Sequence, residues 1–142
     1  MDEIRLGALT IRFLLEGERS GGSVAAFEFE VPAHTAVPIP HSHDGYEETM
    51  YGLTGVLRWT LDGVAVDVGP GEVLCVRRGV VHHFENATAH DARALAIVSP
   101  GVLGPGYFRE LAAILDAAAG GPPDQDAVEA TMRRHGLTLV RT

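Results

Sequence analysis

The segment "PHSHDGYEETMYGLTG" (residues 40–55) places two histidines and two glutamates within eight consecutive positions. On a β-strand, His41 and His43 lie on the same face, with their imidazoles roughly 7 Å apart along the chain. A His-x-His pair near a turn is more often a polar strand edge than a metal site. The pair alone therefore leaves both interpretations open.

The acidic half of this segment follows a predicted turn. Asp44-Gly45 is a turn signal, and a turn here lets the next strand run back beside the strand that carries the histidines. Glu48 then converges on the same point as the imidazoles, whereas Glu47, one residue earlier, points away. This hairpin would bring two imidazoles and one carboxylate together.

A second histidine pair occurs in "GEVLCVRRGVVHHFEN" (residues 71–86), where His82-His83 follow a predicted strand and a turn at Gly79. A neighbouring strand of this kind can supply the further ligand that the first cluster lacks. Neutral imidazole combined with carboxylate suits Zn, Fe, Mn, Ni or Cu. The two histidine segments together therefore favour a metal site over a polar turn.

Short strands separated by turn residues account for the chain up to about residue 100. Residues 24–32 alternate with period two, and "VLRWTL" and "VAVDV" flank Asp62-Gly63 within residues 56–68, which is the strongest hairpin signal in the sequence. Further strands are expected at residues 9–15, 72–76 and 92–99. Turns at intervals of about 8–12 residues predict an all-β sandwich or barrel.

The pattern changes to helical after Pro100. Residues 107–119 carry apolar side chains at helical spacing and are followed by Gly120-Gly121. A second short helix is expected at residues 124–135, with Asp124 as its N-cap and Gly136 at its end. The two helices are too small to form a domain and are expected to pack on the β-structure.

The spacing of the histidine segments resembles the two sequence motifs of the cupin superfamily. In the first motif, four residues separate His-x-His from a glutamate and six more separate the glutamate from a glycine, which corresponds to His41, His43, Glu48 and Gly55. The second motif is matched by Gly71, Gly79, His82 and Asn86, with Arg77 in the place of the usual proline. The resemblance covers roughly residues 24–100, and the whole chain is similar to small single-domain bacterial cupins of the quercetinase-like type.

The resemblance implies a fold and a set of metal ligands. Residues 1–100 would form an all-β cupin double-stranded β-helix (a jelly-roll barrel), and residues 101–142 a C-terminal extension of two short α-helices packed on it within one domain. One divalent transition-metal ion would be held in the barrel mouth by His41, His43, Glu48 and His82. His83 has the opposite strand parity and would face solvent or stand behind the ligands, and Asn86 would hold the loop after its strand.

The resemblance also suggests side chains that would contact a substrate near the ligands, namely Met50, Trp59, Arg77, Phe84, Tyr107 and Phe108. Arg77 would either be a surface charge or reach inward to hold a substrate carboxylate. Tyr107 and Phe108 would either close the barrel mouth or anchor a helix in the core. An apolar pocket of this kind favours an aromatic or otherwise hydrophobic substrate.

The leading functional interpretation is a metal-dependent oxygenase, a quercetinase-like dioxygenase that acts on a small phenolic or diketone-like molecule. Glu48 would double as the catalytic base that removes the substrate's proton. The presence of Glu48 makes the chain unlike cupins that oxygenate thiols, which typically keep only the three histidines. A redox-neutral lyase, cyclase or isomerase with the ion as Lewis acid is the alternative. A non-catalytic small-molecule-binding or sensor protein is the third interpretation.

The composition limits the classes of partner. The chain has 142 residues and a formal net charge of −8, which argues against nucleic acid and anionic membranes because both reward clustered basic residues. All eleven basic residues are arginines, so Schiff-base chemistry on a lysine is excluded. No apolar run approaches ~18 residues and the N-terminus lacks the pattern of a secretory signal, so a cytoplasmic protein is expected.

Three further expectations concern the rest of the chain. Cys75, the single cysteine, lies in the middle of the predicted strand 72–76 and is expected to be a small buried hydrophobe. No Gly-x-Ser-x-Gly motif is present, so serine-triad hydrolysis is unsupported. A homodimer is expected because the predicted strand 9–15 would supply a sheet edge that needs cover.

Overall fold

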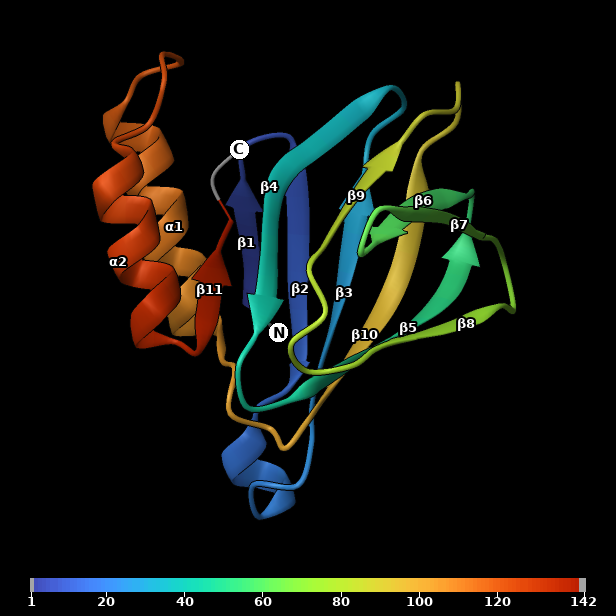
Figure 1. Cartoon of the computed structure of the whole chain (residues 1–142), viewed down its shortest axis with the longest axis horizontal. Coiled ribbons are helices and arrows are strands. Elements are labelled where there is room, and N and C mark those ends of the chain that lie inside the picture. Colours follow the sequence, from blue (N-terminus) through green and yellow to red (C-terminus); the bar gives the residue numbers. More distant parts are fainter. Residues whose placement is uncertain (1, 141–142) are drawn as a thin grey trace.

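The computed structural model describes residues 2–140, which fold into two antiparallel β-sheets enclosing a common core, with two helices at one side (Figure 1). The six-stranded sheet has the order β1-β2-β3-β10-β5-β8. Its strands, in that order, are Asp2–Leu6, Leu9–Leu15, Ala25–Val31, Ala92–Ser99, Glu47–Thr54 and Val73–Val76. The five-stranded sheet has the order β11-β4-β9-β6-β7. Its strands, in that order, are Leu137–Leu139, Thr35–His43, His82–Asn86, Leu57–Leu61 and Val64–Val68. The expected all-β double-stranded β-helix is confirmed.

Alternating side chains hold the strands against the core. In β3, Phe27 and Phe29 are buried, and the glutamates between and after them face outward. One of these, Glu28, accepts a hydrogen bond from Arg93 on the neighbouring β10 at 3.1 Å. The inward side chains of β10 are Ala92, Ala94, Ala96 and Val98. Small residues on β10 therefore leave room in the core for the aromatic rings of the adjacent strand.

The predicted hairpin is confirmed as β6 and β7. Asp62 and Gly63 form its turn with φ of 46° and 85°, the two positive values that a type I′ turn requires. Trp59, on β6, is almost completely buried. Val64 and Val66, on β7, are exposed because this strand is an edge of the five-stranded sheet.

The expected pairing of the two strands around Asp44-Gly45 is wrong. β4 pairs with β9 and β11, whereas β5 pairs with β10 and β8 in the other sheet. The turn therefore carries the chain from one sheet to the other instead of closing a hairpin. Glu48 lies on β5 and consequently faces the histidines of β4 across the space between the sheets.

Two further expectations are also wrong. Residues 9–15 form β2, which is hydrogen-bonded to β1 on one side and β3 on the other, so β1 and β8 are the edges of this sheet. Cys75 is exposed. Its neighbour Val76 is fully buried, so the alternation of β8 turns the thiol outward, on an edge strand whose outer face is uncovered.

Gly55 follows β5 at a position that only glycine fits. Its φ is 69°, and a Cβ at this position would lie 2.5 Å from the backbone oxygen of Asp91. The left-handed backbone and the close approach both exclude a side chain. The backbone conformation therefore requires a glycine at this position of the first motif, independently of the metal ligands.

The two C-terminal helices are confirmed as α1 (Pro105–Ala117) and α2 (Gln125–Arg134), and a short 3-10 helix, η1 (Gly17–Ser20), follows β2. The helices contact each other, and they contact β1 and β11 (Figure 1). Asp124 caps α2 as expected, because its carboxylate accepts hydrogen bonds from the backbone of Asp126 and Ala127. Neither helix is long and apolar enough to cross a membrane.

A short strand after α2 was not expected from the sequence. Gly136, with φ of 82°, ends the helical segment, and β11 then pairs with β4. In this register Leu137 is opposite His43 and Leu139 is opposite His41. The last described residues of the chain therefore cover the outer edge of the strand that carries the first histidine pair.

Candidate metal centre

Three histidines from two adjacent strands meet inside the barrel. His41 on β4 is the register partner of His82 on β9, and His43 lies two residues further along β4 on the same face. Their nearest ring nitrogens all lie within 4.8 Å of one another. The ring centroids are 4.5 Å apart for His41–His82 and for His43–His82, and 5.3 Å apart for His41–His43. Direct pairing of β4 with β9 therefore brings together two histidine segments that lie far apart in the sequence.

Glu48 reaches the same point from the opposite sheet. Its Oε1 lies 3.7 Å from His43 Nε2 and 4.0 Å from His82 Nε2. These separations are too long for good hydrogen bonds. They are comparable with the ~3–4 Å between donor atoms that share an ion with bonds of ~2.0–2.2 Å. The three imidazoles and the carboxylate thus enclose a point that a cation can occupy.

Backbone carbonyls fix the orientation of two of the imidazoles. His41 Nδ1 is 2.8 Å from the carbonyl oxygen of Ile39, and His82 Nδ1 is 3.0 Å from that of Val80. Each Nδ1–H donates to its carbonyl, which leaves Nε2 as the unprotonated atom. His82 Nε2 is buried and has no hydrogen-bond partner. A buried lone pair without a donor matches the requirement of a metal ligand.

The protonation states of the three histidines also suit a cation. Burial, together with the neighbouring imidazoles, lowers the pKa of His41 to about 4 and that of His43 to about 2. Burial also lowers the pKa of His82. The histidines are therefore neutral near pH 7, the form that binds metal. Burial raises the pKa of Glu48 to about 8, because no positive charge offsets the loss of solvent around its carboxylate.

Tyr46 supports the cluster and was not identified from the sequence. Its ring stacks on that of His43 with the centroids 4.6 Å apart, and it is almost completely buried. The Tyr46 hydroxyl and His43 Nδ1 are both buried without a hydrogen-bond partner. No motif marks this tyrosine, since its role follows only from the path of the chain between β4 and β5.

An apolar cavity of about 120 Å³ adjoins the histidines. His41, His43, Glu48 and His82 line it, together with aromatic and aliphatic side chains from both sheets and from α1. Four of the expected substrate contacts are among the lining residues, namely Trp59, Phe84, Tyr107 and Phe108. The buried indole Nε1 of Trp59 has no hydrogen-bond partner. Burial raises the pKa of Tyr107, and the Glu48 carboxylate adds to this effect, so Tyr107 keeps its proton.

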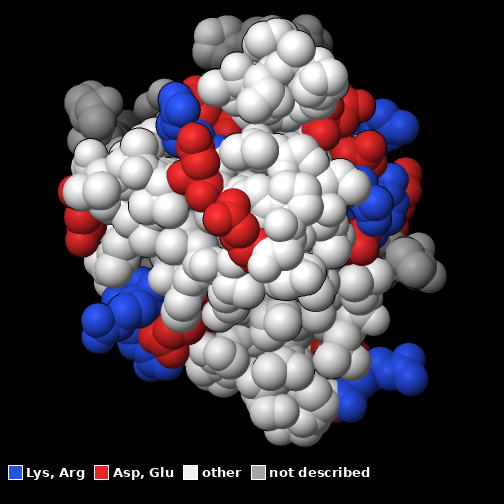
Figure 2. All heavy atoms as spheres, turned by 90° about the vertical axis from the view of Figure 1, so that its right-hand side faces the viewer, with Lys and Arg blue, Asp and Glu red and all other residues white. Residues whose placement is uncertain are grey.

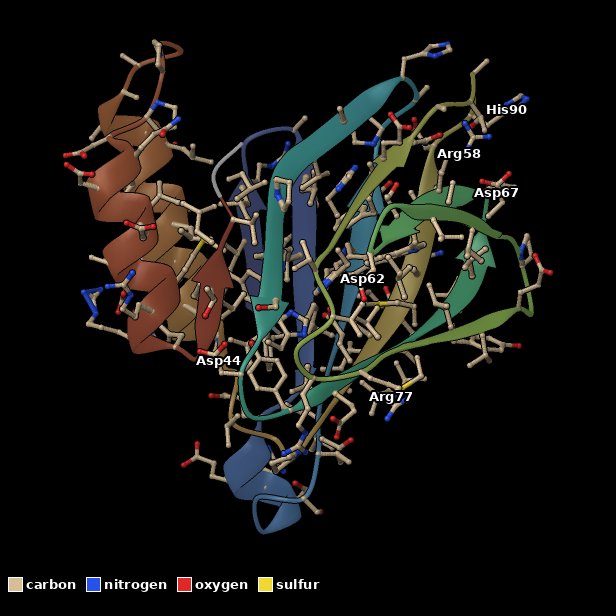
Figure 3. All side chains as sticks on the ribbon, in the orientation of Figure 1. Asp44, Arg58, Asp62, Asp67, Arg77 and His90 are labelled. Atoms are coloured by element: carbon tan, nitrogen blue, oxygen red, sulfur yellow. The ribbon has the colours of Figure 1, made fainter. Side chains whose placement is uncertain are left out.

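Two of the expected substrate contacts do not line this cavity. Met50 is fully buried but absent from the cavity wall, because it lies further along β5 among the core side chains. Arg77 is exposed and points away from the barrel (Figure 3). It lies between the end of β8 and the turn at Gly79, so it does not face the barrel interior and is a surface charge.

The residues next to the ligands have structural partners outside the cavity. Glu47 accepts hydrogen bonds from the Arg78 backbone at 3.1 Å and from its guanidinium at 2.8 Å. His83 is only partly buried and alternates with the buried His82 and Phe84. Asn86 is buried, donates to the backbone oxygens of Val31 and His90, and accepts from Thr88, so it holds the loop after β9.

Comparison with known proteins gives a family and a fold. A family model described as "Cupin domain" matches residues 27–98. Quercetin 2,3-dioxygenase of Bacillus subtilis (strain 168) is 26% identical over 110 residues, which cover 78% of this chain and 32% of that protein. This chain therefore spans about a third of the length of that relative.

Solved structures agree with the fold. KdgF from Halomonas sp. superposes with a TM-score of 0.62 at 15% identity, covering 70% of this chain and 86% of that chain. A protein described as a predicted oxalate decarboxylase from Thermotoga maritima superposes with a TM-score of 0.61 at 25% identity, covering 65% and 80% of the two chains. The first likeness concerns the fold alone.

Proposed function

This chain belongs to the cupin family, and from that membership we propose that it is a metal-dependent oxygenase acting on a small apolar or aromatic substrate. The observation that carries the proposal is the position of three neutral imidazoles and one carboxylate in the wall of an apolar cavity. The 26% identity with a quercetin 2,3-dioxygenase supports the reaction class. The substrate is argued below from the cavity itself.

The proposed ligands are His41, His43, His82 and Glu48. The donor set suits one divalent ion of Fe, Mn, Ni, Cu or Zn. When bound, such an ion would supply Lewis acidity and, for the redox-active metals, a means of activating dioxygen. The carbonyls of Ile39 and Val80 would keep two imidazoles in the tautomer that ligation needs.

Glu48 is the proposed base. It is the one carboxylate among the described residues of the cavity wall, and in the metal-free site burial raises its pKa to about 8. In this role the carboxylate accepts the proton of a phenol or of the enol form of a diketone. A dioxygenase places both atoms of O₂ in its products, so the reaction requires no external reductant.

The walls of the cavity favour a small, largely apolar substrate. Phe84, Trp59 and Tyr107 exclude water, and the indole Nε1 of Trp59 and the hydroxyl of Tyr107 are donors for a substrate oxygen. A dry apolar cavity of roughly 150 Å³ binds benzene. A cavity of about 120 Å³ therefore suits one small ring or a compact diketone head, and is too small for a three-ring flavonol.

A redox-neutral lyase, cyclase or isomerase is the second candidate. It is favoured by the same buried acid, because a carboxyl group with a pKa of about 8 can move a proton without any oxidant. Oxygen consumption separates the two classes. A coordinatively closed ion, with no exchangeable position for a ligand, would instead favour a non-catalytic binding protein.

The decisive experiment is elemental analysis of the protein purified without added metal, followed by oxygen-uptake measurements with single-ring phenols and β-diketones. Iron, manganese, nickel and copper forms are compared with the zinc form. Oxygen uptake that depends on substrate and on a redox-active ion supports the oxygenase. Turnover without oxygen uptake supports the second candidate, and protein that never retains stoichiometric metal contradicts both.

The ligand assignment is tested with two adjacent alanine variants. His82→Ala is expected to lose most of the bound metal, because His82 Nε2 faces the other imidazoles. His83→Ala is the matched control, since its side chain has the opposite parity and should leave metal stoichiometry nearly unchanged. Equal losses from both variants would contradict the assignment.

A further inference from the structure

A second, larger cavity lies on the helix side of the barrel, and we refer to it as the helix-side cavity. Its volume is about 550 Å³, and its walls come from the β1–β2 turn, β4, β11 and both C-terminal helices. Its wall residues include Ala36 on β4, Leu115 on α1 and Gln125 on α2. Ala36 and Gln125 are exposed, so the helix-side cavity opens to solvent.

The lining of the helix-side cavity is aliphatic and uncharged. Among the residues that the structure describes, no Asp, Glu, Arg or His side chain lines this cavity, and the polar side chains there are those of Thr35 and Gln125. A charged or strongly hydrogen-bonding ligand would lose its hydration here without receiving partners. The chemistry of the walls therefore selects an aliphatic ligand.

The helix-side cavity adjoins the cavity of the metal centre. Five aliphatic side chains line both cavities, namely Leu6, Leu9, Val37, Ile39 and Leu111. The partition between the two is therefore one layer of side chains, without a charged group. A chain that crosses this layer therefore meets aliphatic side chains only.

The strand in this partition is irregular where the two cavities meet. In the pairing of β4 with β9, Val37 is opposite Phe84 and His41 is opposite His82. Three residues of β4 thus stand against one residue of β9, which is a bulge immediately before the first histidine. Ile39 lies within the bulge, lines both cavities, and holds the His41 imidazole through its carbonyl.

We propose that the helix-side cavity binds the unbranched alkyl tail of the substrate whose oxygen-bearing head lies at the metal centre. The inference rests on the proposed function and deepens it by naming the substrate class: a β-diketone or phenol that carries a straight aliphatic chain. The head occupies the 120 Å³ cavity beside the imidazoles. The tail crosses the partition beside Ile39 and extends towards Leu115 and the opening.

The test is direct binding of straight-chain β-diketones with alkyl tails of increasing length. Calorimetry with the zinc-loaded protein under anaerobic conditions measures affinity without turnover. Each added methylene should tighten binding roughly fourfold, the effect of burying one CH₂, until the helix-side cavity is filled. Affinity that stays constant from the shortest to the longest tail would overturn the proposal.

Two variants locate the tail. Leu115→Trp fills the helix-side cavity from α1, and Ala36→Phe fills it from β4, so one remains informative if the other fails to fold. Each should abolish the gain from longer tails and leave metal content and the affinity for the shortest diketone unchanged. Leu14→Trp is the matched control, because Leu14 is exposed on β2 away from both cavities. A full chain-length effect in both filled variants would contradict the assignment.

The outcomes separate this inference from the proposed function. Oxygen uptake with short diketones but no chain-length effect would retain the oxygenase and remove the tail site. A chain-length effect in a protein that never consumes oxygen would retain the tail site and remove the oxygenase. Chain-length dependence that persists in His82→Ala with an unchanged slope, at weaker overall affinity, is expected if the head and the tail bind in separate cavities.

Discussion

Tyr46, which contacts His43, combines several unusual features. The tyrosine is buried, its ring stacks on a candidate ligand, and its hydroxyl lacks a hydrogen-bond partner. An unsatisfied buried hydroxyl is unfavourable for the folded state, while the ring contributes packing and orients the imidazole. The two contributions can be measured separately by two substitutions.

Tyr46→Phe keeps the ring and removes the unpaired hydroxyl, so we expect the free energy of unfolding to be unchanged or to rise by about 1 kcal/mol. Tyr46→Ala removes the ring as well and should lower it by about 3–5 kcal/mol. Urea denaturation of the metal-free protein measures both values. A Tyr46→Phe protein that is clearly destabilised would mean that the hydroxyl is hydrogen-bonded.

Glu47 gives a prediction for the dependence of stability on pH. Its hydrogen bonds with Arg78 lower the Glu47 pKa from 4.5 to about 2. A carboxyl group whose pKa is lower in the folded state stabilises the protein above its unfolded pKa and loses this effect as the pH falls through the folded value. Glu47→Gln should therefore be less stable than the wild type at pH 6, and the difference should shrink as the pH falls from about 4.5 to about 2.

Urea midpoints of the two proteins across this pH range provide the measurement for Glu47. The difference between the two midpoints reports on the Glu47 carboxyl group, because the other acidic residues are the same in both proteins. Glu16→Gln is a suitable control on the surface. A stability difference that stays constant from pH 6 to pH 2 would show that the substitution acts through packing rather than through the Arg78 pair.

At the scale of elements, structure that depends on local sequence signals can be predicted from the sequence, whereas pairing between distant segments cannot. The β6–β7 hairpin could be predicted because Asp and Gly readily adopt the positive φ values that its two-residue turn requires. Asp44-Gly45 gives an equally local turn signal, but the partners of β4 are β9 and β11, which lie far along the chain. No local pattern distinguishes a hairpin turn from a crossing between sheets.

The same distinction applies to the site and its cavities. The resemblance to the cupin motifs implied His41, His43, Glu48 and His82, and these side chains lie close together, although the hairpin expected to bring Glu48 there is absent; their role as metal ligands stays a prediction. Met50 has the same parity as Glu48, yet it packs in the core, since the depth of a residue along the barrel is a property of the whole fold. Tyr46, β11 and the helix-side cavity arise from tertiary packing and have no sequence signature.

The N-cap of α2 is the element-scale test. Asp124 accepts two backbone hydrogen bonds at the start of the helix. Asp124→Ala should lower the free energy of unfolding by about 1 kcal/mol, a typical value for the loss of a capping side chain. Asp116→Ala is the control, because Asp116 is an exposed residue in the last turn of α1. Equal effects of both substitutions in urea denaturation would contradict a capping role.

At the scale of the molecule, the side opposite the helices carries a group of exposed apolar residues, which we call the edge face. It comprises Tyr51, Val64, Val66 and Val73, with Val64 65% and Val73 62% exposed. Uncharged atoms cover much of this side of the molecule, a row of acidic side chains runs from its upper left to its centre, and basic side chains lie towards its margins (Figure 2). The unpaired edges of β7 and β8 belong to the same face. Apolar side chains beside two open strand edges favour association with a second copy of the chain.

We therefore expect a homodimer through the edge face. Light scattering after size-exclusion chromatography should give about twice the monomer mass for the wild type. The double variant Val64→Glu, Val73→Glu should be monomeric, because two buried carboxylates per subunit would oppose the contact. Val102→Glu is the control, since Val102 is 60% exposed on the loop before α1. A monomeric wild type would contradict this expectation.

The pairing of β11 with β4 has a consequence for how the protein is made. The chain's final strand lies against the strand of His41 and His43, and Thr138 and Gly136 hydrogen-bond to Asp44 in the turn that follows it (Figure 3). During translation β4 is synthesised long before β11, so the outer edge of the histidine-bearing strand stays uncovered until β11 has been made and pairs with it. The outer edge beside the candidate ligands is therefore closed by a contact between segments that lie far apart in the sequence.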